Sequence, residues 1–245
     1  MRPGSTGAAM GTPKSIATYA DAERSTIEPF ARWSEVVPLV LTPVQTDRVE
    51  ARAAVGGAYA GKRLIDAVFA GAALLLLAPL MALIWLLVVG TSAGPGLFWS
   101  QRIGRDGGIF WMPKYRTMTS GAPLSPREAL EAAESHITPI GALLRRSALD
   151  ELPQLFCVLT GEMSIIGPRP LLPQDPGVAA RRRFPDALRA RPGLSGLAQV
   201  VGRNSVSPRR KARLDALYAQ STSLALDAHI FWRTAGIVLT SRGFL

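Results

Sequence analysis

Cysteine and histidine are almost absent from this sequence, and their scarcity excludes several kinds of chemistry. Among 245 residues there is one cysteine, Cys157, and there are two histidines, His136 and His229. A lone cysteine cannot form an internal disulfide framework, and its place in the apolar run LFCVL predicts a buried thiol. Two distant histidines give little support to a histidine zinc site or a Ser/His triad. Any phosphate or metal chemistry must therefore use carboxylates and arginines.

Acidic residues are also scarce, with 18 Asp and Glu against 28 Lys and Arg and a formal net charge of +10. Residues 1–60 contain equal numbers of acidic and basic residues, so the excess belongs to residues 61–245. Positive charge combined with a positive mean hydropathy favours a membrane surface as partner. A basic nucleic-acid-binding protein is the alternative. The basic residues are dispersed, however, aromatic residues make up only 7%, and no nucleic-acid-binding module is recognisable, so no nucleic-acid partner is expected.

The first 60 residues are rich in Ala, Gly, Pro, Ser and Thr. They contain no positively charged start followed by an apolar stretch, so a signal peptide is not expected. We expect residues 1–60 to form a flexible N-terminal tail.

A long uncharged apolar run covers residues 67–89. As a straight helix it measures roughly 34 Å, enough for a hydrocarbon core of about 30 Å. Pro79 lies at its middle and predicts a kink. Basic residues flank the run on both sides, including Lys62 and Arg102, and cytoplasmic flanks attract such residues. A kinked, re-entrant helix hairpin over residues 61–92 is therefore favoured over a single membrane pass.

Residues 93–245 predict an α+β domain that is mostly helical with a few short strands. Two strands and a glycine-rich turn are expected first, and a third short strand is expected in SIIGPRP. The last helix is amphipathic, which fits an interfacial helix and a helix packed on the domain core about equally. The expected elements are strands near 97–101 and 109–115, and helices over 126–147 with a break at Pro139, in PQLFCVLT before Gly161, and over 208–220 and 222–240.

The segment RRSALDELPQLF places two adjacent carboxylates, Asp150 and Glu151, in an otherwise basic chain. Pro153 is tolerated only in the first turn of a helix, so both carboxylates fall at a helix start, where negative charge is stabilised. For an isolated DELP segment, a purely structural N-cap at Asp150 is the more common explanation.

Neighbouring cations favour a functional explanation instead. Arg145 lies about one turn upstream, and Lys114 and Arg116 lie on a predicted strand. A carboxylate among cations stays ionised near neutral pH and can attack phosphorus, which is the role expected for Asp150. Mg²⁺ prefers carboxylate and phosphate oxygens, so Glu151 is the expected metal ligand.

Arg169 is a further expected phosphate-binding cation. It lies between Pro168 and Pro170, which fix its backbone.

Four segments, in order, carry a resemblance to a known family. They are KRLIDAVFAGAALLLLAPL, SQRIGRDGGIFWMPKYRTM, RRSALDELPQLFCVLTGEMSIIGPRP and RPGLSGLAQVVGRN. On these segments the chain resembles the bacterial sugar transferases, the monotopic phosphoglycosyl transferases that initiate surface-glycan assembly. The likeness covers about residues 61–242.

The resemblance implies an enzyme that transfers a sugar 1-phosphate from a nucleotide sugar, usually a UDP-hexose, to polyprenyl (undecaprenyl) phosphate. UMP would be released, and exopolysaccharide, capsule, O-antigen or glycoprotein glycan assembly would begin. Asp150 would form a covalent aspartyl-phosphosugar, and Glu151 would bind Mg²⁺. Arg145 and the Pro168-Arg169-Pro170 motif would contact substrate phosphates or nucleotide.

The resemblance also implies a place in the cell. The chain would lie in the bacterial inner membrane, among its lipids, with a catalytic domain over residues 93–245 on the cytoplasmic face. A homodimer is left open, as is the sugar. A membrane-tethered scaffold without activity is a third alternative, and the intact pair of Asp150 and Glu151 argues against it.

Overall fold

The structure is a computed structural model that describes residues 58–119, 136–202 and 206–239. All of these residues belong to one compact unit, Val40–Leu245. The predicted tail, apart from residues 58–60, lies outside the described residues, and so does the first part of the predicted helix over 126–147.

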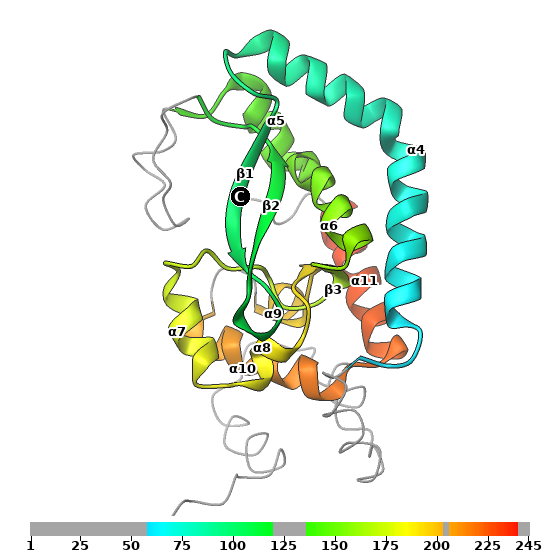
Figure 1. The fold of residues 1–245 in the computed structure, drawn as a ribbon, viewed down its shortest axis with the longest axis vertical. Coiled ribbons are helices and arrows are strands. Elements are labelled where there is room, and N and C mark those ends of the chain that lie inside the picture. The colour runs from blue at the N-terminus through cyan, green and yellow to red at the C-terminus, as the bar shows by residue number, and fades with distance from the viewer. Residues whose placement is uncertain (1–57, 120–135, 203–205, 240–245) are drawn as a thin grey trace, which may run out of the picture. The chain divides into compact units, whose positions relative to one another are not determined.

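The described residues form a mostly helical α+β fold with a few short strands, as the sequence predicts, and these strands form two small two-stranded sheets (Figure 1). The helices are α4 (Lys62–Thr91), α5 (Pro139–Ser147), α6 (Leu155–Thr160), α7 (Pro176–Arg182), α8 (Asp186–Arg189), α9 (Leu197–Gly202), α10 (Pro208–Ser221) and α11 (Leu224–Leu239), with the 3-10 helices η1 (Arg105–Gly107) and η4 (Leu149–Gln154). The strands are β1 (Leu97–Ile103), β2 (Ile109–Tyr115), β3 (Ser164–Ile166) and β4 (Gly193–Ser195).

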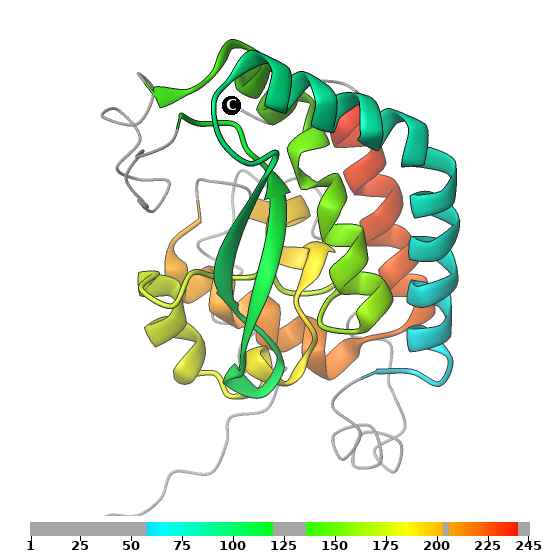
Figure 2. The same cartoon turned by 45° about the horizontal axis from the view of Figure 1, so that its top comes forward.

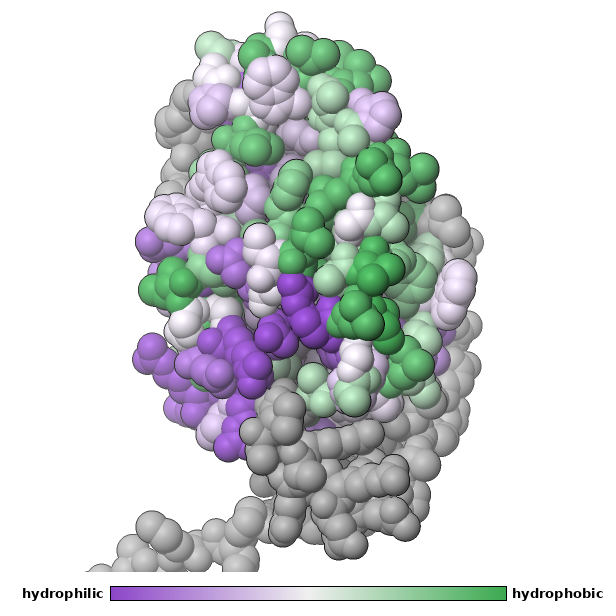
Figure 3. All heavy atoms as spheres, turned by 45° about the vertical axis from the view of Figure 1, so that its right-hand side comes forward, coloured by the Kyte–Doolittle hydropathy of each residue, from purple (hydrophilic) through white to green (hydrophobic). Residues whose placement is uncertain are grey.

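Helix α4 is a continuous helix with Pro79 inside it. Its ribbon changes direction part-way along, and α6 and α11 lie beside it in both views (Figures 1 and 2). Only 11% of its most apolar 18-residue window is buried, and side chains such as Leu75 and Leu76 are about four-fifths exposed, at 81% and 79%. A core helix of a soluble protein would bury these side chains. Figure 3 shows the resulting band of apolar residues on this face, so α4 is suited to membrane association.

The first turn of α4 is attached to the rest of the unit by buried polar contacts. Lys62 Nζ lies 2.5 Å from a carboxylate oxygen of Asp227 on α11. Asp66 accepts hydrogen bonds from the Ser164 hydroxyl (2.7 Å) and the Ile165 backbone N–H (3.1 Å) at β3. Asp66 also lies 4.0 Å from Lys62 Nζ. Because these groups are buried, their mutual contacts fix where α4 leaves the domain.

The second half of α4 is tied to the end of β2. Tyr115 donates its hydroxyl hydrogen to the Met81 carbonyl oxygen at 2.7 Å. Arg116 donates to the carbonyl oxygen of Val88 in the last turn of α4 (3.4 Å) and to those of Ser92 and Ala93 just beyond it, and its side chain is buried. The last carbonyls of a helix lack intrahelical partners, so this guanidinium caps the C-terminal end of α4.

The predicted hairpin is confirmed, with β1 and β2 antiparallel and joined by η1. Phe98 pairs with Lys114 and Arg102 pairs with Phe110. Residues directly opposite each other share a face and alternate residues return to it, so Lys114 and Arg102 point to the same side. That side faces the interior of the domain, where Phe110 is buried.

The second sheet pairs β3 and β4 in parallel, and it requires glycine at its closest approach. A Cβ atom on Gly193 would lie 2.1 Å from the backbone nitrogen of Gly167. No side chain fits at that distance, so the backbone of Gly193, the first residue of β4, lies directly against that of Gly167, which follows β3. The sequence predicts a strand at β3, whereas β4 was not predicted.

We expect the substitution Gly193→Ala to destabilise the fold by roughly 1–3 kcal/mol or more, because the added methyl group must displace backbone. Thermal unfolding of the purified protein in detergent measures this. Gly236→Ala is the matched control, because a Cβ atom there meets nothing within 4 Å. An equally small effect of both substitutions would contradict the close approach of β3 and β4.

Candidate active site

Asp150 and Glu151 lie in the first turn of η4, which continues directly into α6. The predicted helix start is therefore confirmed in position, although it begins as a 3-10 helix. The residue that caps η4 is Ala148, in a left-handed conformation with φ 55°, and no side chain makes a capping hydrogen bond. Asp150 is buried at 9% exposure without being the N-cap, so the purely structural explanation for this carboxylate is not supported.

Glu151 is held by cations from two other elements. Its Oε1 atom lies 2.6 Å from Lys114 Nζ on β2 and 3.8 Å from Arg169 Nη2, in the loop after β3. Burial alone would raise the pKa of Glu151, but Lys114, Arg169 and Arg102 together lower it to about 2. Glu151 is therefore a carboxylate throughout the physiological pH range.

Asp150 has a different electrostatic environment. Burial raises the pKa of its carboxyl group, and the negative charge of Glu151 adds to the rise. Lys114 and Arg145 act in the opposite direction. Adjacent carboxylates whose pKa values are pushed in opposite directions are typical of sites where the two groups have different roles.

Two residues of this site were not predicted from the sequence. A hollow, which we call the Glu151 pocket, is lined by Glu151, Lys114 and Arg169, and also by Arg102 and Gln154. Arg102 Nη1 lies 3.4 Å from the Pro170 carbonyl oxygen. Burial, and to a smaller extent repulsion from Arg169, lowers the pKa of Arg102 to about 10. A cation with a depressed pKa beside another cation is suited to bind an anion.

Gln154 is the second unpredicted residue. Its side chain is 2% exposed, and its Nε2 amide nitrogen has no hydrogen-bond partner among the described residues. An unpaired buried donor is costly, so it is available to a ligand group in the pocket. The sequence signal that could have indicated Gln154 is its spacing of three residues from Glu151, which places both side chains on the same side of a helix.

The remaining expected site residues divide into two groups. Arg145, on α5, donates its Nε hydrogen to Thr117 Oγ1 (2.9 Å) and lies near enough to Asp150 to lower its pKa. Pro168 and Pro170 are buried on either side of the exposed Arg169. The structure does not bring Arg116 into the group, because its guanidinium caps α4.

The carboxylates offer an incomplete metal site by themselves. No cluster of three or more His, Cys, Asp or Glu side chains occurs within residues 58–119, 136–202 and 206–239. Mg²⁺ is commonly bound by one or two carboxylates together with substrate phosphates. Glu151 fits that pattern, since both of its cation contacts involve Oε1 and the described residues give Oε2 no partner.

The part of the chain that contains these residues matches a known protein family. The family model described as bacterial sugar transferase matches residues 57–241. The chain belongs to the bacterial sugar transferase family. It is a transferase, and the matched range contains every residue of the Glu151 pocket.

Several named proteins are similar to about three quarters of the chain. The exopolysaccharide production protein ExoY of Rhizobium meliloti is 37% identical, over 74% of this chain and 87% of its own length. The UDP-glucose:undecaprenyl-phosphate glucose-1-phosphate transferase of Caulobacter vibrioides is also 37% identical, over 74% and 70%. The undecaprenyl-phosphate galactose phosphotransferase of Salmonella typhimurium is 34% identical, and the match covers 74% of this chain but 41% of that longer protein.

Proposed function

We propose that this sugar transferase moves a sugar 1-phosphate from a nucleotide sugar, with a UDP-hexose as donor, to undecaprenyl phosphate. UMP is the other product, and the lipid-linked sugar begins an exopolysaccharide, capsule, O-antigen or glycoprotein glycan. The observation that carries this proposal is the placement of Asp150 beside Lys114 and Arg145, next to the permanently ionised Glu151. The names of the relatives, which include two undecaprenyl-phosphate transferases, support the same reaction.

In the first step, a carboxylate oxygen of Asp150 forms a bond to the phosphorus that carries the sugar. The bond from that phosphorus to the bridging oxygen of the diphosphate breaks, and its electron pair leaves with UMP. Lys114, Arg102 and Arg169 surround the pocket and neutralise the negative charge of the donor. The product of this step is an aspartyl-phosphosugar.

In the second step, an oxygen of the lipid phosphate attacks the same phosphorus. The acyl-phosphate bond breaks and Asp150 regains its carboxylate. Splitting the transfer into two displacements lets one nucleophile serve a water-soluble donor and a membrane-bound acceptor in turn.

Mg²⁺ is the proposed cofactor, and Glu151 Oε2 is its proposed protein ligand. An ion held there by Glu151 would neutralise charge on the donor phosphates. Lys114 keeps Glu151 ionised and orients its carboxylate with the 2.6 Å contact.

The pH dependence of turnover is expected to report Asp150. Its pKa is raised, so the reactive carboxylate is lost as pH falls through that value, whereas Glu151 stays ionised down to about pH 2. A single acid limb in kcat/KM is therefore predicted. Lys114→Gln is expected to move the limb to higher pH, because Lys114 lowers the pKa of Asp150. Glu151→Gln is expected to move it to lower pH. Limbs that do not move in these opposite directions would show that another group titrates.

We also propose that α4 is re-entrant, with both of its ends on the cytoplasmic face of the inner membrane, and that α11 lies in the interface. Pro79 supports the bend, and polar contacts hold both ends of the helix to the same domain, at Lys62 and at Arg116. A helix that crossed the membrane would separate these two attachments by the width of the bilayer. When the protein carries a tag at its N-terminus or at its C-terminus, we expect both tags to be accessible in intact cells from the cytoplasm only. An N-terminal tag that is accessible from outside would show a spanning helix.

The reaction is tested with membranes that contain the protein, a panel of UDP-sugars and undecaprenyl phosphate, with UMP release as the measurement. We expect release with at least one UDP-hexose and only in the presence of active protein. A membrane scaffold without activity predicts no release from any donor. A nucleic-acid-binding protein predicts salt-dependent binding in a gel shift, which we do not expect.

A further inference from the structure

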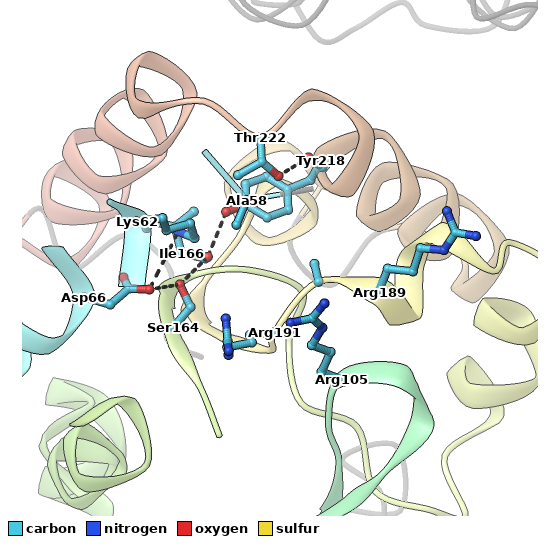
Figure 4. A pocket seen from close by; sticks show the side chains of 11 residues that line it. Ala58, Lys62, Asp66, Arg105, Ser164, Ile166, Arg189, Arg191, Tyr218 and Thr222 are labelled. Atoms are coloured by element: carbon cyan, nitrogen blue, oxygen red, sulfur yellow. Dashed lines mark hydrogen bonds and ion pairs between the residues drawn. The ribbon is translucent and has the colours of Figure 1, made fainter. Parts of the chain in front are cut away.

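A second hollow, which we call the basal pocket, lies at the first turn of α4 (Figure 4). Lys62, Arg105, Arg189 and Arg191 contribute basic groups to its lining. None of its lining residues also lines the Glu151 pocket. In Figure 4 the side chains of Arg105 and Arg191 lie on the same side of the pocket, whereas the guanidinium group of Arg189 points away from them.

The acidic groups around the basal pocket are engaged elsewhere. Asp66 accepts hydrogen bonds from β3, and Lys62 is paired with Asp227. Arg105 has one ion pair, from Nε to the 66% exposed Asp106, which solvent weakens. The described residues give Arg191 no carboxylate partner.

Arg191 uses only part of its guanidinium within the protein. Its Nε hydrogen is donated to the Gly161 carbonyl oxygen at 2.9 Å, which leaves both terminal nitrogens to the pocket. Burial lowers the pKa of Arg191, and repulsion from Arg105 and Arg63 lowers it further. Clustered guanidinium groups with free N–H donors form a typical site for a phosphate oxygen.

The surroundings of the basal pocket indicate where the phosphate comes from. Leu64 and Val68, within two turns of Lys62, are 68% and 63% exposed. Trp232 on α11 is 71% exposed and stacks edge-on with Phe231. Exposed apolar and aromatic residues next to basic ones mark the level where lipid tails end and headgroups begin. Figure 3 shows the same change, from the apolar band to strongly hydrophilic residues.

We propose that the basal pocket binds the phosphodiester of an anionic phospholipid, with Arg105 and Arg191 as the principal ligands. The bound headgroup holds the first turn of α4 at the membrane surface. This site is separate from the transferase reaction and does not depend on it.

The proposal is tested with the full-length protein in a neutral detergent, by following its thermal stability as short-chain phosphatidylglycerol is added. We expect saturable stabilisation by this lipid. The substitutions Arg105→Gln and Arg191→Gln are each expected to raise the apparent Kd about tenfold, as loss of one charge-assisted hydrogen bond implies. Arg182→Gln is the matched control, because Arg182 is exposed on α7 and lines neither pocket. It is expected to change the Kd less than about twofold.

Three comparisons decide the identity of the ligand. Phosphatidylcholine is expected to bind more weakly, because its ammonium group is repelled by the arginines, and inorganic phosphate is expected not to compete at equal concentration. Equal, arginine-dependent binding of phosphatidylcholine, or full competition by inorganic phosphate, would overturn the assignment to an anionic lipid. Farnesyl phosphate bound more tightly through the same arginines would identify an acceptor site instead. Binding unaffected by Arg105→Gln, in a variant shown to be folded by its thermal unfolding, would overturn the site itself.

Discussion

The substitution Asp150→Asn is expected to reduce UMP release by roughly 10⁴-fold or more, the scale of loss seen when a covalent nucleophile is removed. The amide is similar in size to the carboxylate but carries no negative charge, so it cannot form the bond to phosphorus. The environment of Asp150 explains the size of the effect. Lys114 and Arg145 are placed to stabilise a charge that the asparagine lacks.

The protein itself is expected to remain intact in this variant. The asparagine carries no charge, so the variant avoids both the free-energy cost of burying a carboxylate and its repulsion from Glu151. Thermal stability should therefore be unchanged or slightly higher. Asp106→Asn is the matched control, because Asp106 is exposed on η1 and lies outside the Glu151 pocket. Turnover by the Asp150 variant at the rate of this control would remove Asp150 from the reaction.

The substitution Lys114→Gln is expected to lower kcat/KM by about 10²–10³-fold, the range for removal of one preorganised group that stabilises charge. Lys114 is the cation closest to Glu151 and also acts on Asp150. Without it, Glu151 loses its orientation and the donor diphosphate loses a neutralising charge. Steady-state kinetics with a saturating acceptor measures this loss.

Lys114→Arg is the informative companion variant, since it keeps the charge and changes the geometry. It should recover part of the activity, whereas Arg182→Gln, which removes a cation outside the pocket, should leave kcat/KM unchanged. If Lys114→Gln were as active as the Arg182 variant, the ion pair with Glu151 would have only a structural role.

The sequence predicts the site where local signals are strong. Pro153 restricts where the helix after Asp150 can begin, and the structure starts η4 at Leu149. The glycine-rich turn specifies the β1–β2 hairpin, whose register then places Lys114. Helices α10 and α11 also form close to their expected ranges, because their apolar periodicity and flanking residues are local features.

Other features depend on contacts between distant segments and are not encoded locally. Arg102 and Lys114 lie on the same face of the hairpin, but this can be deduced only from the register of the two strands. Arg116 is close to the site in sequence, but it follows the last residue of β2, Tyr115, and its guanidinium binds carbonyl oxygens at the end of α4. Strand β4 has three residues and exists because Gly167 and Gly193 allow the two backbones to approach. The short helices α7, α8 and α9 give too little periodicity to be predicted.

The contacts between α4 and the domain connect the membrane segment to the chemistry. Tyr115 joins α4 to β2, the strand that also carries Lys114. The buried apolar residues Leu155 and Val158 of α6 pack in one cluster with Ala70 of α4. Asp150, the proposed nucleophile, is therefore held at a fixed place relative to the apolar band.

The formation of a covalent bond between Asp150 and the sugar phosphate is the central claim, and it is tested by trapping. The purified protein is incubated with an active UDP-sugar in the absence of undecaprenyl phosphate, quenched, digested and analysed by mass spectrometry. One sugar-phosphate is expected on the peptide that contains Asp150, together with about one equivalent of UMP, and neither is expected from Asp150→Asn. UMP released without any adduct, or an adduct on a different residue, would contradict the account.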